Sequence, residues 1–229
     1  MRNLGKVVLH IPAREGSKRV PRKNMRLMNN KPMISYTIDA SLKSQVTENI
    51  YINTDSSEII EYIKTTYTNV LIYERDTYLA DDKASSDEFN YDIIKKLKPN
   101  TLIMINPVCP LITANDIQNA LDCYKNSNCD TLITSTSTQM QTFCDGKPVN
   151  ININEQLAPS QNNGLIEILN WAITIWDVPS FIHNMETKGF ASLGINRILF
   201  NIDPIKAIKV SEEKDFVFAE QMIKCGDKQ

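Results

Sequence analysis

Short apolar runs alternate with amphipathic stretches over the first part of the chain. The runs are rich in valine, isoleucine and leucine, which is typical of buried strands. Between them, apolar residues recur every three or four positions, which is the period of a helix with one buried face. The pattern predicts strands at 6–13, 49–53, 70–73, 101–105 and 130–137, and helices at 32–44, 57–66, 85–97 and 114–126.

This alternation indicates the fold class. Two strands that are joined through a helix of this length lie parallel in one sheet, because a tight turn cannot connect them. We therefore expect an α/β fold with a doubly wound, mostly parallel sheet that resembles the Rossmann arrangement.

The pattern changes after residue 138. Residues 139–164 are rich in Asn, Gln, Ser and Thr, and the segment DGKP at 145–148 is typical of a hairpin tip. An apolar stretch with Trp171 and Trp176 follows. Two aromatic residues in such a stretch more often pack in a core or a dimer interface than in a sugar pocket.

The pattern of residues after the tryptophans predicts four more elements. They are a helix at 179–187, strands at 198–202 and 207–210, and a last helix at 212–224 with Ser211 as its cap. We expect one domain over residues 1–229 with an extension at about 139–194.

Composition and charge exclude several classes of protein. Apolar residues make up 42% and charged residues 23% of the chain, as in folded globular proteins rather than disordered ones. The formal net charge of −2 does not favour a nucleic-acid polymer as partner. No apolar run approaches the ~20 residues that cross a bilayer, so we expect neither a membrane partner nor a signal peptide.

The cysteines indicate a compartment rather than a metal site. Five cysteines form no CxxC pair, and the chain has two histidines without zinc-type spacing. Reduced thiols are typical of a reducing environment, so the expected location is cytoplasmic.

The loop after the first predicted strand is the strongest candidate for a binding site. It leaves the carboxyl end of that strand, where open α/β sheets bind ligands. Five cations lie within ten residues: Arg14, Lys18, Arg19, Arg22 and Lys23. Gly16 and Ser17 allow close backbone approach, and their N–H groups can face an anion. The loop suits a polyphosphate, although it has no GxxxxGK[ST] pattern.

Six segments, taken in order, resemble one enzyme family. The segment IPAREGSKRVPRKN at 11–24 is similar to the signature of the cytidylyltransferases that activate acidic sugars as CMP conjugates, the CMP-sialic acid synthetases and their relatives. The segments that follow it are NTDSSEI at 53–59, ERD with LADD and ASS at 74–86, NPVCPL at 106–111, NWAI at 170–173, and DF with AE at 215–220. Together they span nearly the whole chain.

The resemblance implies a nucleotidyltransferase in which a sugar hydroxyl attacks the α-phosphate of CTP and pyrophosphate leaves. Arg14 and Lys18 would hold the phosphates, and Lys23 would neutralise charge that develops on the α-phosphate. The nucleotide contacts that complete this set are Ser17, Asn24, Arg75, the backbone near Ala80, and Ser85 or Ser86. Positioning and charge neutralisation account for most of such catalysis.

The magnesium site of the family is altered here. Where the family has a DxD pair before the last helix, this chain has Lys209, Val210 and Ser211. Lysine cannot ligate a hard cation and serine replaces a carboxylate poorly. Three alternatives remain open: Lys209 replaces the metal charge; Mg²⁺ is held by the triphosphate and water near Asp203 or Asp215; or catalysis is impaired. Mg²⁺ is an expected cofactor, but its protein ligands are not assigned.

The acceptor site of the family is altered as well. Ser160 and Ile168 stand where two arginines would read the sugar carboxylate, and neither can replace that two-point bond. Asn106, Gln161 and Asn170 are the candidate acceptor contacts. An unusual acid held by Arg197 or Lys188 is a further alternative.

Three functions follow from these observations. The first is CMP transfer from CTP to an acidic sugar of the nonulosonic type. The second is CMP transfer to a non-sugar acid such as a phosphonate, and the third is a silent nucleotide-binding relative. The intact loop at 14–24 favours an enzyme. The resemblance also implies a homodimer in which the extension completes the partner's acceptor pocket.

Overall fold

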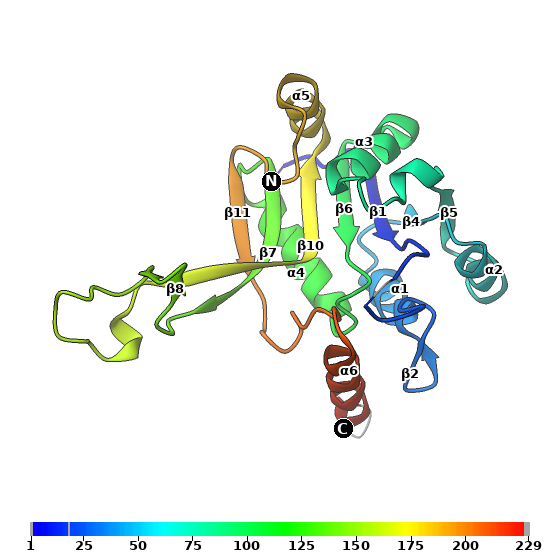
Figure 1. The fold of residues 1–229 in the computed structure, drawn as a ribbon. Helices are drawn as coiled ribbons and strands as arrows, with labels where there is room; N and C mark the ends of the chain where they lie inside the picture. Colours follow the sequence, from blue (N-terminus) through cyan, green and yellow to red (C-terminus); the bar gives the residue numbers. More distant parts are fainter. Residues whose placement is uncertain (1, 18, 227–229) are drawn as a thin grey trace.

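A computed structural model describes residues 2–17 and 19–226 of the chain. Its centre is a seven-stranded sheet with the order β11-β7-β10-β6-β1-β4-β5 (Figure 1). These strands are β1 (Val7–Pro12), β4 (Ile50–Thr54), β5 (Leu71–Glu74), β6 (Thr101–Ile105), β7 (Thr131–Thr138), β10 (Ile166–Asp177) and β11 (Arg197–Asn201). All pairs are parallel except those of β10, which runs antiparallel to β6 and β7. The expected mostly parallel α/β sheet is confirmed.

Helices cover both faces of the sheet because successive strand residues point to opposite faces. The helices are α1 (Met33–Ser44), α2 (Ser57–Thr66), α3 (Ser86–Leu97), α4 (Ala114–Lys125), α5 (Val178–Lys188) and α6 (Glu213–Gly226), with short 3₁₀ turns at Thr77–Leu79 and Ser160–Asn162. On one face, Leu9 and Ile103 pack with α1, α2 and α4. On the other, Val8 and Leu102 pack with α3 and α5.

Local side chains determine where two of these helices begin. Ser85 and Glu88 form a reciprocal capping box at the start of α3, and Thr113 and Asp116 form another at the start of α4. At the last helix, the expected cap takes a different form. The Asp215 carboxylate accepts the backbone N–H groups of Ser211 and Glu212, each at 2.9 Å.

Two parts of the sheet differ from the expectation. The apolar stretch around the tryptophans forms β10, a strand of 12 residues between β6 and β7 that was not predicted. The strand expected at 207–210 is wrong, since 204–207 form a turn. Two of its apolar residues are buried for other reasons: Ala207 packs in the core beside α1, α2 and α4, and Val210 packs with Phe216 of α6.

An arm of residues 139–165 projects from the sheet between β7 and β10 (Figure 1). It carries the hairpin of β8 (Phe143–Cys144) and β9 (Lys147–Pro148), whose tip has positive φ at Asp145 and Gly146. A second small hairpin joins β2 (Leu27–Met28) and β3 (Lys31–Pro32) near the first loop. The projecting part is shorter than the expected 139–194, because β10 and α5 belong to the body. None of the described helices has the length and apolar character needed to cross a membrane.

Candidate active site

The candidate site lies at the carboxyl ends of β1 and β6. From β1 the chain continues outward through β4 to β5, whereas β6 lies on the other side of β1. This reversal is the topological switch point at which open α/β sheets bind ligands. Two neighbouring pockets lie here, and Pro12, Arg14 and Asn106 line both of them.

The first, which we call the loop pocket, encloses about 320 Å³. Its lining residues are Pro12, Arg14, Gly16, Ser17, Arg19, Val20, Lys23, Asn24, Asn106, Pro107, Val108 and Ser211. Among these described residues three are cations and none is a carboxylate. The Ser17 N–H, one of the predicted anion contacts, donates to the Glu15 carbonyl oxygen at 2.8 Å, so it is the three cations that suit this pocket to a polyphosphate.

Lys23 and Asn24 are held in place at the rim of the loop pocket. Lys23 Nζ donates to the carbonyl oxygen of Val210 at 2.9 Å, and Asn24 Nδ2 donates to the carbonyl oxygen of Arg14 at 3.3 Å. Burial, and then the nearby cations Arg19 and Lys209, lower the pKa of the Lys23 ammonium. Because cations crowd this group, a bound anion would favour its charged form.

Arg14 lies between the two pockets and is engaged by the loop before α3. Its Nη1 donates to the carbonyl oxygen of Ala80 at 3.1 Å, and its Nη2 lies 2.8 Å from the Asp82 carboxylate. A phosphate that binds Arg14 must therefore compete with Asp82. Lys18, which was predicted to share this role, lies outside the described residues.

The second pocket, which we call the inner pocket, encloses about 380 Å³. Its lining residues are Pro12, Arg14, Arg75, Ser86, Phe89, Met104, Asn106, Trp171 and Lys209. Apolar and aromatic surfaces alternate there with cations, as in sites that bind an organic anion.

Arg75 is the most rigidly held cation of the inner pocket. Its Nε donates to Asn53 Oδ1 at 2.7 Å, its Nη2 donates to the Asn53 carbonyl oxygen at 2.9 Å, and its guanidinium lies 4.5 Å from the centre of the Phe89 ring. Burial is the main cause that lowers its pKa, to about 10, so Arg75 remains charged at neutral pH. A planar group fixed in this way can present a donor to a base or a phosphate.

The two serines at the start of α3 have different surroundings. The Ser85 hydroxyl takes part in the capping box with Glu88. Ser86 lines the inner pocket, and its hydroxyl lies 3.2 Å from that of Ser192. Ser86 is therefore the better placed nucleotide contact of the pair.

Three residues were predicted to contact the acceptor. Within a single chain, Asn106 is the one of these three that lines the two pockets. Gln161 lies on the arm, in the short turn Ser160–Asn162. Asn170 is buried, and its Oδ1 accepts from Thr134 Oγ1 at 2.6 Å and from the Ala172 N–H at 3.1 Å. Its oxygen therefore supports the backbone of β10 instead of facing a ligand.

The alternative anchor Arg197 has its own partners. Its Nε and Nη2 donate to the carbonyl oxygens of Leu193 and Gly194 at 2.6 and 2.9 Å. It begins β11 opposite Thr131, the first residue of β7, and so lies at the edge of the sheet away from both pockets.

Lys209 and Ser211, at the positions of the family's DxD pair, provide no carboxylate for a magnesium ion. Lys209 lines the inner pocket and Ser211 lines the loop pocket. Asp203 and Asp215 each use a carboxylate oxygen to accept backbone N–H groups. Within the described ranges, no three acidic, cysteine or histidine side chains gather into a metal site.

Sequence reasoning missed three residues of the inner pocket, namely Phe89, Met104 and Trp171. Neither Phe89 nor Met104 belongs to a motif that marks it. Of the two tryptophans, Trp176 lies in the core at 1% exposed, as expected, whereas Trp171 is not a core residue and lines the inner pocket.

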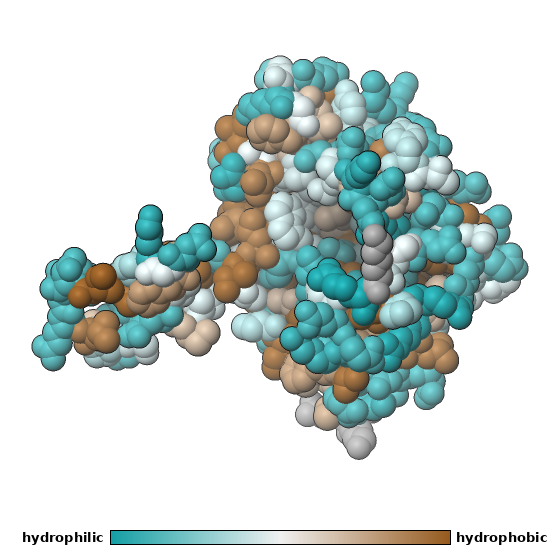
Figure 2. Space-filling view, viewed as in Figure 1, coloured by the Kyte–Doolittle hydropathy of each residue, from teal (hydrophilic) through white to brown (hydrophobic). Residues whose placement is uncertain are grey.

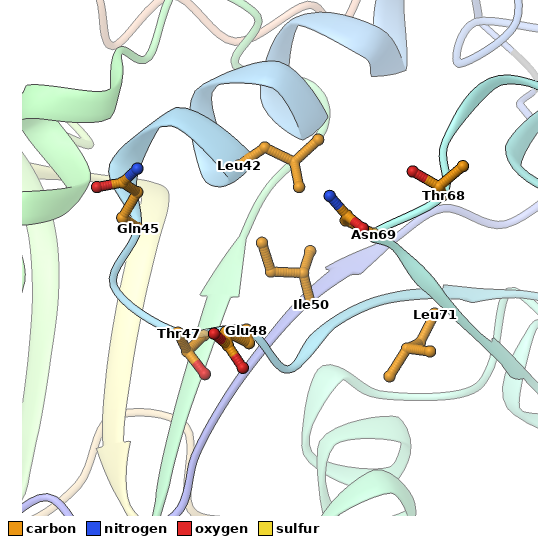
Figure 3. Close-up of a pocket in the computed structure, with 8 residues that line it drawn as sticks. All are labelled: Leu42, Gln45, Thr47, Glu48, Ile50, Thr68, Asn69 and Leu71. Atoms are coloured by element: carbon orange, nitrogen blue, oxygen red, sulfur yellow. The ribbon is translucent and has the colours of Figure 1, made fainter.

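A third hollow of about 670 Å³ lies at the opposite edge of the sheet, where β4 and β5 begin (Figure 3). Leu42 and Ile50 face its middle, between Gln45, Thr47 and Glu48 on one side and Thr68, Asn69 and Leu71 on the other. Among these eight residues Glu48 is charged and no residue is a cation, so this hollow does not suit a phosphate.

Comparison with known proteins identifies the family. The family model for cytidylyltransferase matches residues 8–165. CMP-N,N'-diacetyllegionaminic acid synthase of Legionella pneumophila is 26% identical over 96% of this chain and 97% of its own length. Post-translational flagellin modification protein B of Campylobacter coli is 28% identical over 96% of both chains.

Solved structures have the same fold. CMP:2-keto-3-deoxy-manno-octonic acid synthetase, in complex with CTP, superposes with a TM-score of 0.69 at 13% identity, over 96% of this chain and 99% of that one. The 4-diphosphocytidyl-2C-methyl-D-erythritol synthase of Anaerococcus prevotii gives 0.66 at 10% identity, over 96% of both. The family model, the relatives and the cation-lined pocket at the switch point agree, and this chain belongs to the cytidylyltransferase family.

Proposed function

We propose that this cytidylyltransferase transfers CMP from CTP to an acidic sugar of the nonulosonic type and releases pyrophosphate. The observation that carries the proposal is the cation-lined loop pocket beside a second pocket that has its own cations, Arg75 and Lys209. Relatives named for legionaminic and pseudaminic acids support the acceptor class.

The arrangement assigns a task to each pocket. The loop pocket holds the triphosphate through Arg14 and Lys23, and the wall of the inner pocket with Arg75 and Ser86 holds the cytidine. A hydroxyl oxygen of the acceptor bonds to the α-phosphorus while the bond between the α- and β-phosphates breaks, and a proton is released. Lys23 stabilises the charge that grows on the transferring group, and this preorganised charge lowers the barrier.

The exposed apolar surface of the arm indicates contact with a second copy of the chain. Large apolar side chains are exposed along the arm, namely Met140, Phe143, Val149, Ile153, Leu157 and Leu165. Figure 2 shows hydrophobic surface, in brown, at the tip and the base of the projecting arm. Apolar surface of this extent on a projecting segment favours burial in a partner. We infer a homodimer in which the arm reaches the partner and brings Gln161 to the partner's acceptor pocket.

The cysteines support a reducing location. All five, Cys109, Cys123, Cys129, Cys144 and Cys225, are free thiols. We infer that the enzyme works in the cytoplasm.

A pyrophosphate assay tests the proposed reaction. The protein is incubated with CTP and one acid at a time: N,N'-diacetyllegionaminic acid, pseudaminic acid, N-acetylneuraminic acid or a simple phosphonate. We expect pyrophosphate and a CMP conjugate, detected by its mass, with at least one of the sugars. If product forms with the phosphonate alone, the non-sugar alternative is favoured. If CTP binds but no product forms with any of the four acids, a silent relative is favoured. ATP and UTP are the nucleotide controls.

A further inference from the structure

The backbone of Trp171 has an unusual conformation. Its φ is 59°, in the left-handed region that side chains other than glycine rarely adopt. It lies in β10 where the register with β7 shifts between Leu169 and Thr174, which marks a bulge. A strained backbone conformation of this kind persists only where the surrounding structure enforces it. Residues with such conformations are often found at binding sites.

Buried polar contacts enforce this conformation. Asn170 Oδ1 accepts from Thr134 Oγ1 and from the Ala172 N–H, and Thr134 Oγ1 in turn accepts the N–H of Ile173 at 3.0 Å. On the other side, the Asn106 N–H donates to the Ala172 carbonyl oxygen at 2.9 Å. The backbone on both sides of Trp171 is thus fixed to β7 and to the end of β6.

The result of the bulge is an indole on the wall of the inner pocket. Trp171 lines it together with Lys209, whereas Trp176, farther along the same strand, is buried in the core beside Phe181. The core therefore does not need the Trp171 ring. A flat apolar face and a cation within one pocket fit an amphipathic acid, with one ring face on the indole and its acid group at the ammonium.

We propose that Trp171 determines acceptor specificity: its indole is the platform for the ring of the acidic acceptor, with Lys209 beside it as the cation for the acid group. Asn170 is a positioning residue that acts through Trp171. This inference rests on the proposed function, because that function places the cytidine at the Arg75 wall and leaves the Trp171 wall for the acceptor. Lys209 offers a point charge where an arginine would offer a two-point bond.

Fluorescence provides an equilibrium test, since Trp171 and Trp176 are the two tryptophans of the chain. N,N'-diacetyllegionaminic acid is titrated into the protein with a non-hydrolysable CTP analogue present, so that no turnover occurs. We expect a saturable change in emission with wild type and none with Trp171→Phe, which leaves only the core Trp176. A change that the CTP analogue produces and the acid does not would overturn the inference.

Kinetics provide the second test. Trp171→Gly removes the ring and leaves a residue that adopts positive φ without cost. We expect it to raise the KM for the acid about tenfold or more and to leave the KM for CTP within about twofold. Trp171→Phe keeps an aromatic ring, so its KM for the acid should stay close to that of wild type. Asn170→Ala should raise the acceptor KM in wild type and add little in the Trp171→Gly background, because both act through one side chain.

The two proposals fail in different ways. Wild type that releases no pyrophosphate with any acid contradicts the proposed function. Wild type that is active, with a Trp171→Gly variant whose acceptor KM is unchanged or rises no more than its CTP KM, contradicts only the role of Trp171. Thermal unfolding of each variant shows whether it is folded.

Discussion

Lys23 donates a hydrogen bond from its Nζ to the carbonyl oxygen of Val210 at 2.9 Å, across a separation of 187 residues. This bond joins the first loop to the segment before α6, and it brings the ammonium of Lys23 near that of Lys209. Both segments line the site, so its positive charge depends on parts of the chain that lie far apart in sequence.

Replacement of Lys23 by alanine should lower turnover much more than CTP affinity. Charge grows on the transferring phosphate mainly in the transition state, so loss of the ammonium should reduce kcat by about 100-fold or more. Steady-state kinetics and a CTP titration measure the two effects. The control is Arg22→Ala in the same loop, whose exposed guanidinium pairs with Glu58. Normal kcat with weakened CTP binding would remove Lys23 from the catalytic role.

The pH profile should report the same lysine. Burial and the cations Arg19 and Lys209 lower the pKa of Lys23, so its charge is lost at a lower pH than that of an ordinary lysine. We expect kcat/KM for CTP, which reports the ionisation of groups in the free enzyme, to fall as the pH rises through this lowered value. Lys209→Met removes one cation, which favours protonated Lys23, and should move the alkaline fall to higher pH. A fall that stays in place or moves to lower pH contradicts this assignment.

The magnesium dependence tests whether Lys209 replaces a metal charge. Lys209→Asp combined with Ser211→Asp provides two carboxylates before α6, so activity should depend more strongly on Mg²⁺ than in wild type. Rates across a magnesium titration measure this change. Full, saturable magnesium dependence in wild type, together with an unchanged rate in Lys209→Ala, would show that Lys209 does not substitute for the metal.

Arg75→Ala should weaken CTP binding and also lower stability. The variant removes a cation from the inner pocket and leaves the buried Asn53 Oδ1 without its donor, which costs about 1–3 kcal/mol. Arg75→Lys keeps the charge but cannot reach both oxygens of Asn53, so it should restore CTP binding only in part. Calorimetric titration and thermal unfolding separate the two effects. A folded Arg75→Ala variant with normal CTP affinity would exclude Arg75 from the site.

The arm should hold two copies of the chain together. Phe143 and Val149 are exposed on its hairpin at 53% and 51%. Sedimentation should show a dimer at micromolar concentration, and Phe143→Asp with Val149→Asp should produce monomers with lower acceptor turnover and retained CTP binding. Lys147→Glu, on the same hairpin, is the control for a charge change alone. A wild-type monomer at that concentration contradicts the proposed dimer.

Local pattern was sufficient for most of the α/β alternation. The strand at 101–105 and the helix at 57–66 match β6 and α2, because a buried strand and an amphipathic helix differ in the period of their apolar residues. The first loop was also identified from sequence, since its cations and Gly16 are adjacent in the chain. Its place at the carboxyl end of β1 follows from the strand that precedes it.

Only the tertiary structure decided the rest, because those features depend on partners that are distant in sequence. The position of β10 between β6 and β7 is set by pairing, and Val210 packs onto α6 instead of belonging to a strand. Likewise, Trp171 and Trp176 both belong to β10. One faces the pocket and the other the core because Thr134, on a neighbouring strand, holds Asn170 and fixes the bulge between them. Local periodicity contains no information about such a contact.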